Sequence, residues 1–120
     1  MDPRHALGAR AEDVAAGWLE QQGWTVLARR WRMPRGELDL ICTDREAVLV
    51  GVEVKVRSTA RSGSGPDSVD ARRVLRLRAA LAAYAGSSRV PRAGVRLDLV
   101  SLSPHGGRWW IVRLPGIDAW

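Results

Sequence analysis

The chain of 120 residues carries 19 basic and 13 acidic side chains, a formal net charge of +6, and one cysteine. This length suits a single domain over residues 1–120, the charge favours a polyanionic partner, and the lone Cys42 excludes an internal disulfide and is expected to be a core thiol. No apolar run is long enough to span a bilayer and the first residues lack a signal-peptide pattern, so we expect a soluble, cytoplasmic protein without a membrane partner.

Residues 3–22 are expected to form the first helix, with Asp2 as its N-cap and Gly23 ending it. Apolar side chains recur there at spacings of three and four residues, at Leu7, Ala11, Val14 and Trp18. Glu12 lies at the border of this stripe. It either leans into a cleft at the sheet edge or is a solvated surface side chain.

Three strand-like segments follow the helix. Residues 24–31, 35–41 and 50–57 alternate apolar and polar side chains with the period of two that is typical of β-strands. Valines at alternate positions from 48 to 56 share one face of the third segment, which another layer must cover. The opposite face begins with Leu49 and becomes polar at Glu53, as in a core strand whose end emerges into a cleft.

The polar residues 43–46 predict a hairpin turn between the second and third strands. A turn centred on Arg45 would place Asp39 opposite Gly51, and Glu37 opposite Glu53. Asp39 and Glu53 would then be diagonal neighbours, about 7–8 Å apart at Cα. The missing side chain of Gly51 would leave open space in front of Asp39.

Carboxylates held this close repel one another, and a hard divalent cation between them removes the conflict. We therefore expect Asp39 and Glu53 to bind Mg²⁺ or Mn²⁺, with Glu37 as a further candidate ligand. Lys55 follows Glu53 by two residues on the same face, and it is the only lysine beside eighteen arginines. A compact ammonium there would position an attacking water or offset the charge that grows on a phosphodiester in the transition state.

Residues 58–66 are rich in serine and glycine and have no apolar periodicity. Because this segment leaves the sheet directly after Lys55 and Arg57, one interpretation is a loop that closes over bound nucleic acid. The alternative is an ordinary flexible connection. Arg57 and Arg61 are candidate nucleic-acid contacts in the first case.

A second helix is expected to begin at Asp67 or Ser68 and to reach about Tyr84. Its apolar stripe consists of Val74, Leu77, Leu81 and Tyr84. Three arginines on an adjoining face are candidate phosphate contacts: Arg72, Arg73 and Arg76. A merely solvated arginine face is the alternative.

Residues 95–102 and 108–114 are expected to form the last two strands. For Asp98 a structural ion pair with a nearby arginine is favoured over a role as metal ligand. Trp109 and Trp110 point to opposite faces of a strand, so at most one is expected to be exposed for base stacking. Core packing is the favoured interpretation of these rings.

The two central motifs, GELDLI at 36–41 and VEVKVR at 52–57, resemble those of the YraN family of uncharacterised bacterial proteins. That family is similar in turn to archaeal Holliday-junction resolvases and to the wider PD-(D/E)XK, or restriction-endonuclease-like, nucleases. The resemblance covers most of the chain, from Gly8 in the first helix to the segment 96–100.

This resemblance implies a restriction-endonuclease-like α/β/α sandwich with a central mixed β-sheet, in the order helix, three strands, helix, two strands. It implies Asp39 and Glu53 as metal ligands, Lys55 as the catalytic lysine, and Glu12 as a further carboxylate. The family usually carries a lysine early in the helix after the flexible loop, where this chain has Arg73. An arginine there is compatible with phosphate binding and puts a proton-transfer role in doubt.

The leading hypothesis is a metal-dependent endonuclease-like protein that hydrolyses phosphodiester bonds in nucleic acid, with DNA, including branched or junction DNA, as the expected substrate. The alternative is a non-catalytic nucleic-acid-binding or adaptor module on the same scaffold. An enzyme acting on small molecules is disfavoured because the chain has no glycine-rich phosphate loop. The resemblance to junction-cutting dimers suggests a homodimer.

Overall fold

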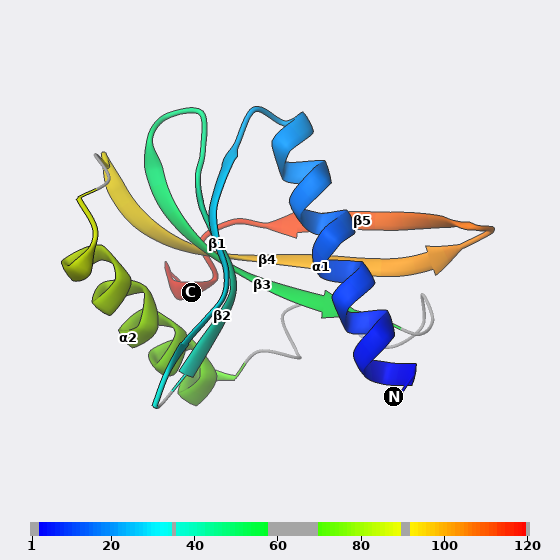
Figure 1. Ribbon diagram of the computed structural model, residues 1–120, viewed down its shortest axis with the longest axis horizontal. Coiled ribbons are helices and arrows are strands. Elements are labelled where there is room, and N and C mark those ends of the chain that lie inside the picture. Colours follow the sequence, from blue (N-terminus) through cyan, green and yellow to red (C-terminus); the bar gives the residue numbers. More distant parts are fainter. Residues whose placement is uncertain (1–2, 35, 58–69, 90–91, 120) are drawn as a thin grey trace.

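A computed structural model describes residues 3–34, 36–57, 70–89 and 92–119 of the chain. Its elements, in chain order, are α1 (Pro3–Gln21), β1 (Thr25–Met33), β2 (Gly36–Thr43), β3 (Val48–Val56), α2 (Ala71–Ser87), β4 (Gly94–His105), β5 (Arg108–Leu114) and the short 3-10 helix η2 (Ile117–Ala119). The predicted order of helix, three strands, helix, two strands is confirmed (Figure 1).

The five strands form one mixed sheet in the order β1-β2-β3-β4-β5. Strands β3 and β4 are parallel, and the other neighbouring pairs are antiparallel. Parallel neighbours need a crossover connection, and α2 lies in it. Because α1 packs on one face of the sheet and α2 on the other, the chain has the predicted restriction-endonuclease-like α/β/α arrangement.

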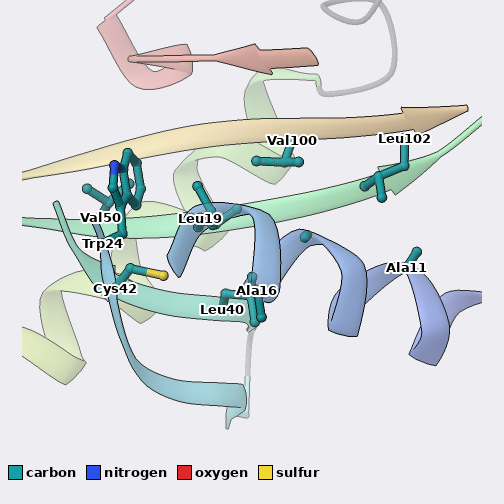
Figure 2. Packing of buried hydrophobic residues seen from close by; sticks show 11 residues of the cluster. Ala11, Ala16, Leu19, Trp24, Leu40, Cys42, Val50, Val100 and Leu102 are labelled. Atoms are coloured by element: carbon teal, nitrogen blue, oxygen red, sulfur yellow. The ribbon is translucent and has the colours of Figure 1, made fainter. Parts of the chain in front are cut away.

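Helix α1 packs on the valine face of β3. Val50 and Val52 are fully buried there against small side chains of the helix, and Val48, Val54 and Val56 pack around them. Figure 2 shows Leu19 and Ala16 of α1 beside Leu40 and Val100 of the sheet. Within residues 10–21 of the helix, the fully buried residues are Ala11, Ala15, Ala16 and Leu19, whereas the predicted Val14 and Trp18 lie partly buried beside them. The predicted Leu7 lies outside the residues whose side chains the structure describes.

Helix α2 covers the opposite face, where it packs against leucines of β3 and β4. It begins after Asp70, whose carboxylate accepts a hydrogen bond from the backbone N–H of Arg73. The predicted cap at Asp67 or Ser68 is therefore wrong, and the helix extends past Tyr84 to Ser87. Its buried residues are Leu77, Ala80, Leu81 and Ala85, with Val74 and Tyr84 partly buried.

The β2–β3 hairpin has a different register from the predicted one. Ile41, and not Asp39, pairs with Gly51. The reason lies in the turn, where the Asp44 carboxylate accepts hydrogen bonds from the backbone N–H groups of Glu46 and Val48. The turn thereby extends to Ala47, which adopts a φ of 64°, and the pairing shifts by two residues.

Gly51 does not leave open space in front of Asp39. It is buried, and a Cβ built on it would lie 3.0 Å from the side chains of both Leu38 and Leu97. The missing side chain therefore lets core leucines pack directly on β3, and this prediction is corrected.

Asp98 of β4 is fully buried and fully paired. Its carboxylate accepts hydrogen bonds from Arg96 (2.7 and 3.0 Å), Arg113 (2.8 Å) and the backbone N–H of Gly116 (3.0 Å). The two guanidinium groups also lie 5.9 and 5.1 Å from the ring centre of Trp24. The predicted structural ion pair is confirmed.

The neighbouring tryptophans of β5 separate as predicted. Trp109 is partly buried against the α1-side core, whereas Trp110 is 64% exposed and contacts His105 edge to face. Cys42 is buried, as expected for a core thiol. Within the described segments, neither helix has the combination of length and apolar character needed to cross a membrane.

Replacement of Asp98 by asparagine should lower the free energy of unfolding by about 3 kcal/mol, because it removes the charge that Arg96 and Arg113 share. The control is Asp13→Ala, which removes an exposed ion pair with Arg29 and should cost about 0–1 kcal/mol. Urea unfolding of both variants measures the difference. Equal losses would show that the Asp98 cluster does not stabilise the fold.

Candidate active site

Strands β2 and β3 diverge at the candidate site. Their ladder runs from Thr43 and Leu49 to Leu40 and Val52, where the paired residues end. Beyond that point β2 pairs only with β1, and β3 pairs only with β4. Figure 1 shows the two strands separating there. Asp39 and Glu53 are the residues that directly follow the last pair, so the fork holds both predicted carboxylates.

Where the backbone pairing of β2 and β3 ends, a side-chain hydrogen bond of Asp39 connects the two strands. The Oδ2 atom of Asp39 accepts a hydrogen bond of 2.7 Å from the backbone N–H of Val54. This contact ties the end of β2 to β3 after the backbones have separated. Glu53 is only 5% exposed and Asp39 is partly buried, so both carboxyl groups have limited contact with water.

This environment raises the pKa of Asp39 to about 8. Burial is the main cause, followed by a hydrogen bond with Glu53 and by the negative charge of Glu53. The N–H of Val54 acts in the opposite direction. At neutral pH the two carboxyl groups therefore disfavour double ionisation, which is the conflict that the sequence predicted.

Arg73 of α2 is the cation that contacts Glu53. Its Nε and Nη2 atoms lie 2.7 and 2.6 Å from the same oxygen, Oε2. The Glu53 side chain is 6% exposed and that of Arg73 is 48% exposed. The ion pair therefore joins a buried carboxylate to an arginine whose side chain keeps about half of its surface in solvent.

A cavity of about 220 Å³ opens beside the fork, lined by Gly36, Glu37, Asp39, Arg73, Arg76 and Leu77. Its position depends on the close approach of α2 to β2. A Cβ built on Gly36 would lie 3.1 Å from the backbone oxygen of Arg76, so a larger residue would push the helix away. The cavity thus has the acidic side chains of Glu37 and Asp39 on the β2 side and the arginines of α2 on the other.

Lys55 lies two residues beyond Glu53 in β3 and is exposed. Strand alternation puts both residues on the side of the sheet that α2 covers. Arg57 follows the end of β3 and is partly buried, with its backbone N–H bonded to the oxygen of Leu102. Arg72 and Arg76 are exposed on α2. Arg61 and the predicted loop 58–66 lie outside the described residues.

The other candidate carboxylates have arginine partners of their own. Glu12 accepts a hydrogen bond of 2.8 Å from Arg30 of β1, so the structure does not bring it to Asp39 and Glu53. Glu37 lines the cavity and pairs with Arg32 at 3.3 Å. In the part of the chain that the structure describes, no three histidine, cysteine or acidic side chains gather closely enough to hold a metal. The central arrangement is therefore a carboxylate pair.

Two features of the site were not predicted from the sequence. One is the direct bond between Arg73 and Glu53, although the correspondence of Arg73 with the family's usual lysine was a signal that it belongs to the site. The other is the Val54 N–H that holds Asp39, which depends on the divergence of two strands and has no sequence pattern.

The sequence profile of the uncharacterised protein family UPF0102 matches residues 11–102. A UPF0102 protein of Beutenbergia cavernae is 40% identical over 118 residues, which cover 98% of this chain and 99% of the relative. A UPF0102 protein of Neisseria gonorrhoeae is 34% identical over 97% of this chain and 100% of its own length. A third, from Bifidobacterium longum, is 37% identical over 85% of this chain and 84% of the relative.

The profile match runs from the middle of α1 through both central motifs into β4, and together with these relatives it confirms the resemblance that the motifs indicated. The chain belongs to the uncharacterised protein family UPF0102.

Proposed function

We propose that this protein is a metal-dependent nuclease that hydrolyses phosphodiester bonds in nucleic acid, with DNA as the expected substrate. The observation that carries the proposal is the pair of carboxyl groups at the strand fork, the partly buried Asp39 and the buried Glu53, beside a cavity that two arginines line. Two acidic groups that resist joint ionisation are suited to binding a divalent cation.

The residues present fit Mg²⁺ or Mn²⁺. The donors are carboxylate oxygens, which hard cations prefer, and Mg²⁺ is commonly held by one or two carboxylates together with waters and substrate phosphates. Asp39 and Glu53 would hold the ion. A divalent ion bound there would lower the pKa of its water and polarise a phosphoryl oxygen.

The remaining roles fall to exposed basic side chains of β3 and α2. Lys55 would position the attacking water or offset the negative charge that develops on the phosphodiester. Arg72 and Arg76 would contact phosphates of the backbone from α2, where both are exposed. The net charge of +6 supports a polyanionic substrate.

One observation favours the second candidate, a nucleic-acid-binding module without turnover. Glu53 already has a cationic partner in Arg73, so a metal is not needed to neutralise it. Both functions use the exposed arginines of α2, but only the nuclease requires metal binding and cleavage, so experiments can separate them.

Calorimetric titration of Mn²⁺ should give saturable binding to the wild type and none to Asp39→Asn, because that change removes one of two ligands. A panel of linear and branched DNAs should be cleaved by the wild type with Mn²⁺ or Mg²⁺.

Lys55→Arg should keep the affinity for metal and DNA while losing cleavage, since a wide planar guanidinium does not replace an ammonium.

Metal binding that survives Asp39→Asn would contradict the assigned ligands, and full cleavage by Lys55→Arg would contradict the role of Lys55. If no metal binds even with DNA present, the binding module becomes the better account.

The double variant Arg72→Gln with Arg76→Gln should weaken DNA binding. Loss of two phosphate contacts should make the slope of log affinity against log salt shallower by about 1.8. The matched control is Arg92→Gln with Arg108→Gln, which removes the same charge from exposed positions outside α2. Fluorescence anisotropy across a salt series measures both slopes, and equal slopes would show that α2 does not bind phosphates.

Without metal, the free energy of unfolding should fall as the pH rises from 3.8 to about 8. The unfolded chain loses the Asp39 proton near the ordinary pKa of 3.8, whereas the folded protein keeps it up to about pH 8. The contribution of this proton to the free energy of unfolding is therefore complete below pH 3.8 and is lost as the pH rises to about 8.

Asp39→Asn should remove much of this fall, because an amide does not titrate in this range, and its oxygen can still accept the Val54 N–H so that the fold is kept. Urea unfolding of both proteins across this pH range is the measurement, with Asp13→Asn at an exposed position as control. A wild-type profile identical to that of Asp39→Asn would show that Asp39 titrates normally.

A further inference from the structure

The Oε2 atom of Glu53 has one charged partner among the described residues. Both Nε and Nη2 of Arg73 point at this single oxygen, at 2.7 and 2.6 Å. A buried carboxylate without a counter-ion is costly, so the guanidinium stabilises the ionised form of Glu53. Glu53, the partner of this guanidinium, is also one of the two proposed metal ligands.

A guanidinium and a divalent cation compete for such a carboxylate. Two positive charges a few ångströms apart in a partly desolvated site repel strongly, whereas one of them is enough to neutralise Glu53. Metal binding through Oε2 therefore requires Arg73 to move away from that oxygen.

The structure allows that movement. Asp70 accepts the backbone N–H of Arg73 at 2.8 Å, which fixes the main chain at the start of α2. The side chain, however, is 48% exposed and lines the cavity together with Arg76. Rotation of the side chain can therefore carry the guanidinium from Glu53 into the cavity without any change in the helix.

We propose that Arg73 is an exchangeable counter-ion, which neutralises Glu53 in the metal-free protein and passes to a nucleic-acid phosphate when a divalent cation takes its place. This inference rests on the proposed function. Arginine suits the exchange because it keeps its charge at all relevant pH values and binds phosphate through two parallel hydrogen bonds. No proton has to be transferred.

Because of this exchange, metal and nucleic acid should bind with positive cooperativity. A phosphate that attracts Arg73 exposes Glu53 to the metal, and a metal on Glu53 releases Arg73 to the phosphate. Such coupling is reciprocal, because each ligand changes the affinity of the other by the same factor. The metal site would therefore fill mainly when substrate is present, which limits hydrolysis to the bound complex.

The test compares Mn²⁺ affinity in the wild type, Arg73→Gln and Arg76→Gln by calorimetry at constant ionic strength. Arg73→Gln removes the competing charge and keeps an N–H donor for Glu53. It should bind Mn²⁺ more tightly than the wild type, by a factor within the range of about 5–150 that is typical of coupled sites. Arg76→Gln removes the same charge from the same cavity without touching Glu53, so it should have a smaller effect.

A second measurement uses Ca²⁺, a hard cation with similar oxygen ligands, and a short labelled DNA duplex whose integrity is checked on a gel. The duplex should raise the Ca²⁺ affinity of the wild type and of Arg108→Gln, at an exposed position outside the site, more than that of Arg73→Gln. If Arg73→Gln is less stable without metal, Mn²⁺ should raise its melting temperature more than it raises that of the wild type.

The inference is overturned if the wild type binds Mn²⁺ through Asp39 and Arg73→Gln binds it no more tightly, and in that case the proposed function stands. If none of the proteins binds Mn²⁺, with or without the duplex, the inference and the metal-dependent function fail together.

Discussion

Two carboxyl groups that are withdrawn from water, at the point where β2 and β3 separate, are the constraint on which the site depends. Ionisation of both Asp39 and Glu53 is unfavourable there unless a cation lies beside them, and the pKa of Asp39, raised to about 8 chiefly by burial, expresses that conflict. The Val54 N–H, the guanidinium of Arg73 and the close packing of α2 on Gly36 all act on this pair.

Asp98 shows how the same fold treats a carboxylate that serves structure. It is fully buried, yet two arginines and the N–H of Gly116 direct four hydrogen bonds to it. Among the described residues, one guanidinium contacts Glu53 and one backbone N–H contacts Asp39, and the two carboxyl groups also hydrogen-bond to each other. The pair also borders a cavity. Two carboxyl groups that share one described guanidinium and lie beside a cavity can accept a cation, whereas the single carboxylate of Asp98 already has two guanidinium partners.

Much of this arrangement could be predicted from the sequence because it depends on local periodicity. The alternation along β3 correctly assigned the valine face to one layer and Leu49 to the other, and β5 was predicted with its observed limits. The charged residues of the central motifs stood out because a core strand rarely carries them. The prediction of the β2–β3 register was wrong because the Asp44 carboxylate lengthens the turn between these strands. The partner of Glu53 comes from α2, twenty residues away, and no local pattern specifies that contact.

A crystal structure of the protein soaked with Mn²⁺, with diffraction recorded at the manganese absorption edge, tests the central claim most directly. The account predicts an anomalous peak between the carboxylates of Asp39 and Glu53, with the Arg73 guanidinium withdrawn from Glu53. Well-ordered carboxylates with no peak between them, and with Arg73 still bonded to Glu53 at saturating Mn²⁺, would contradict it.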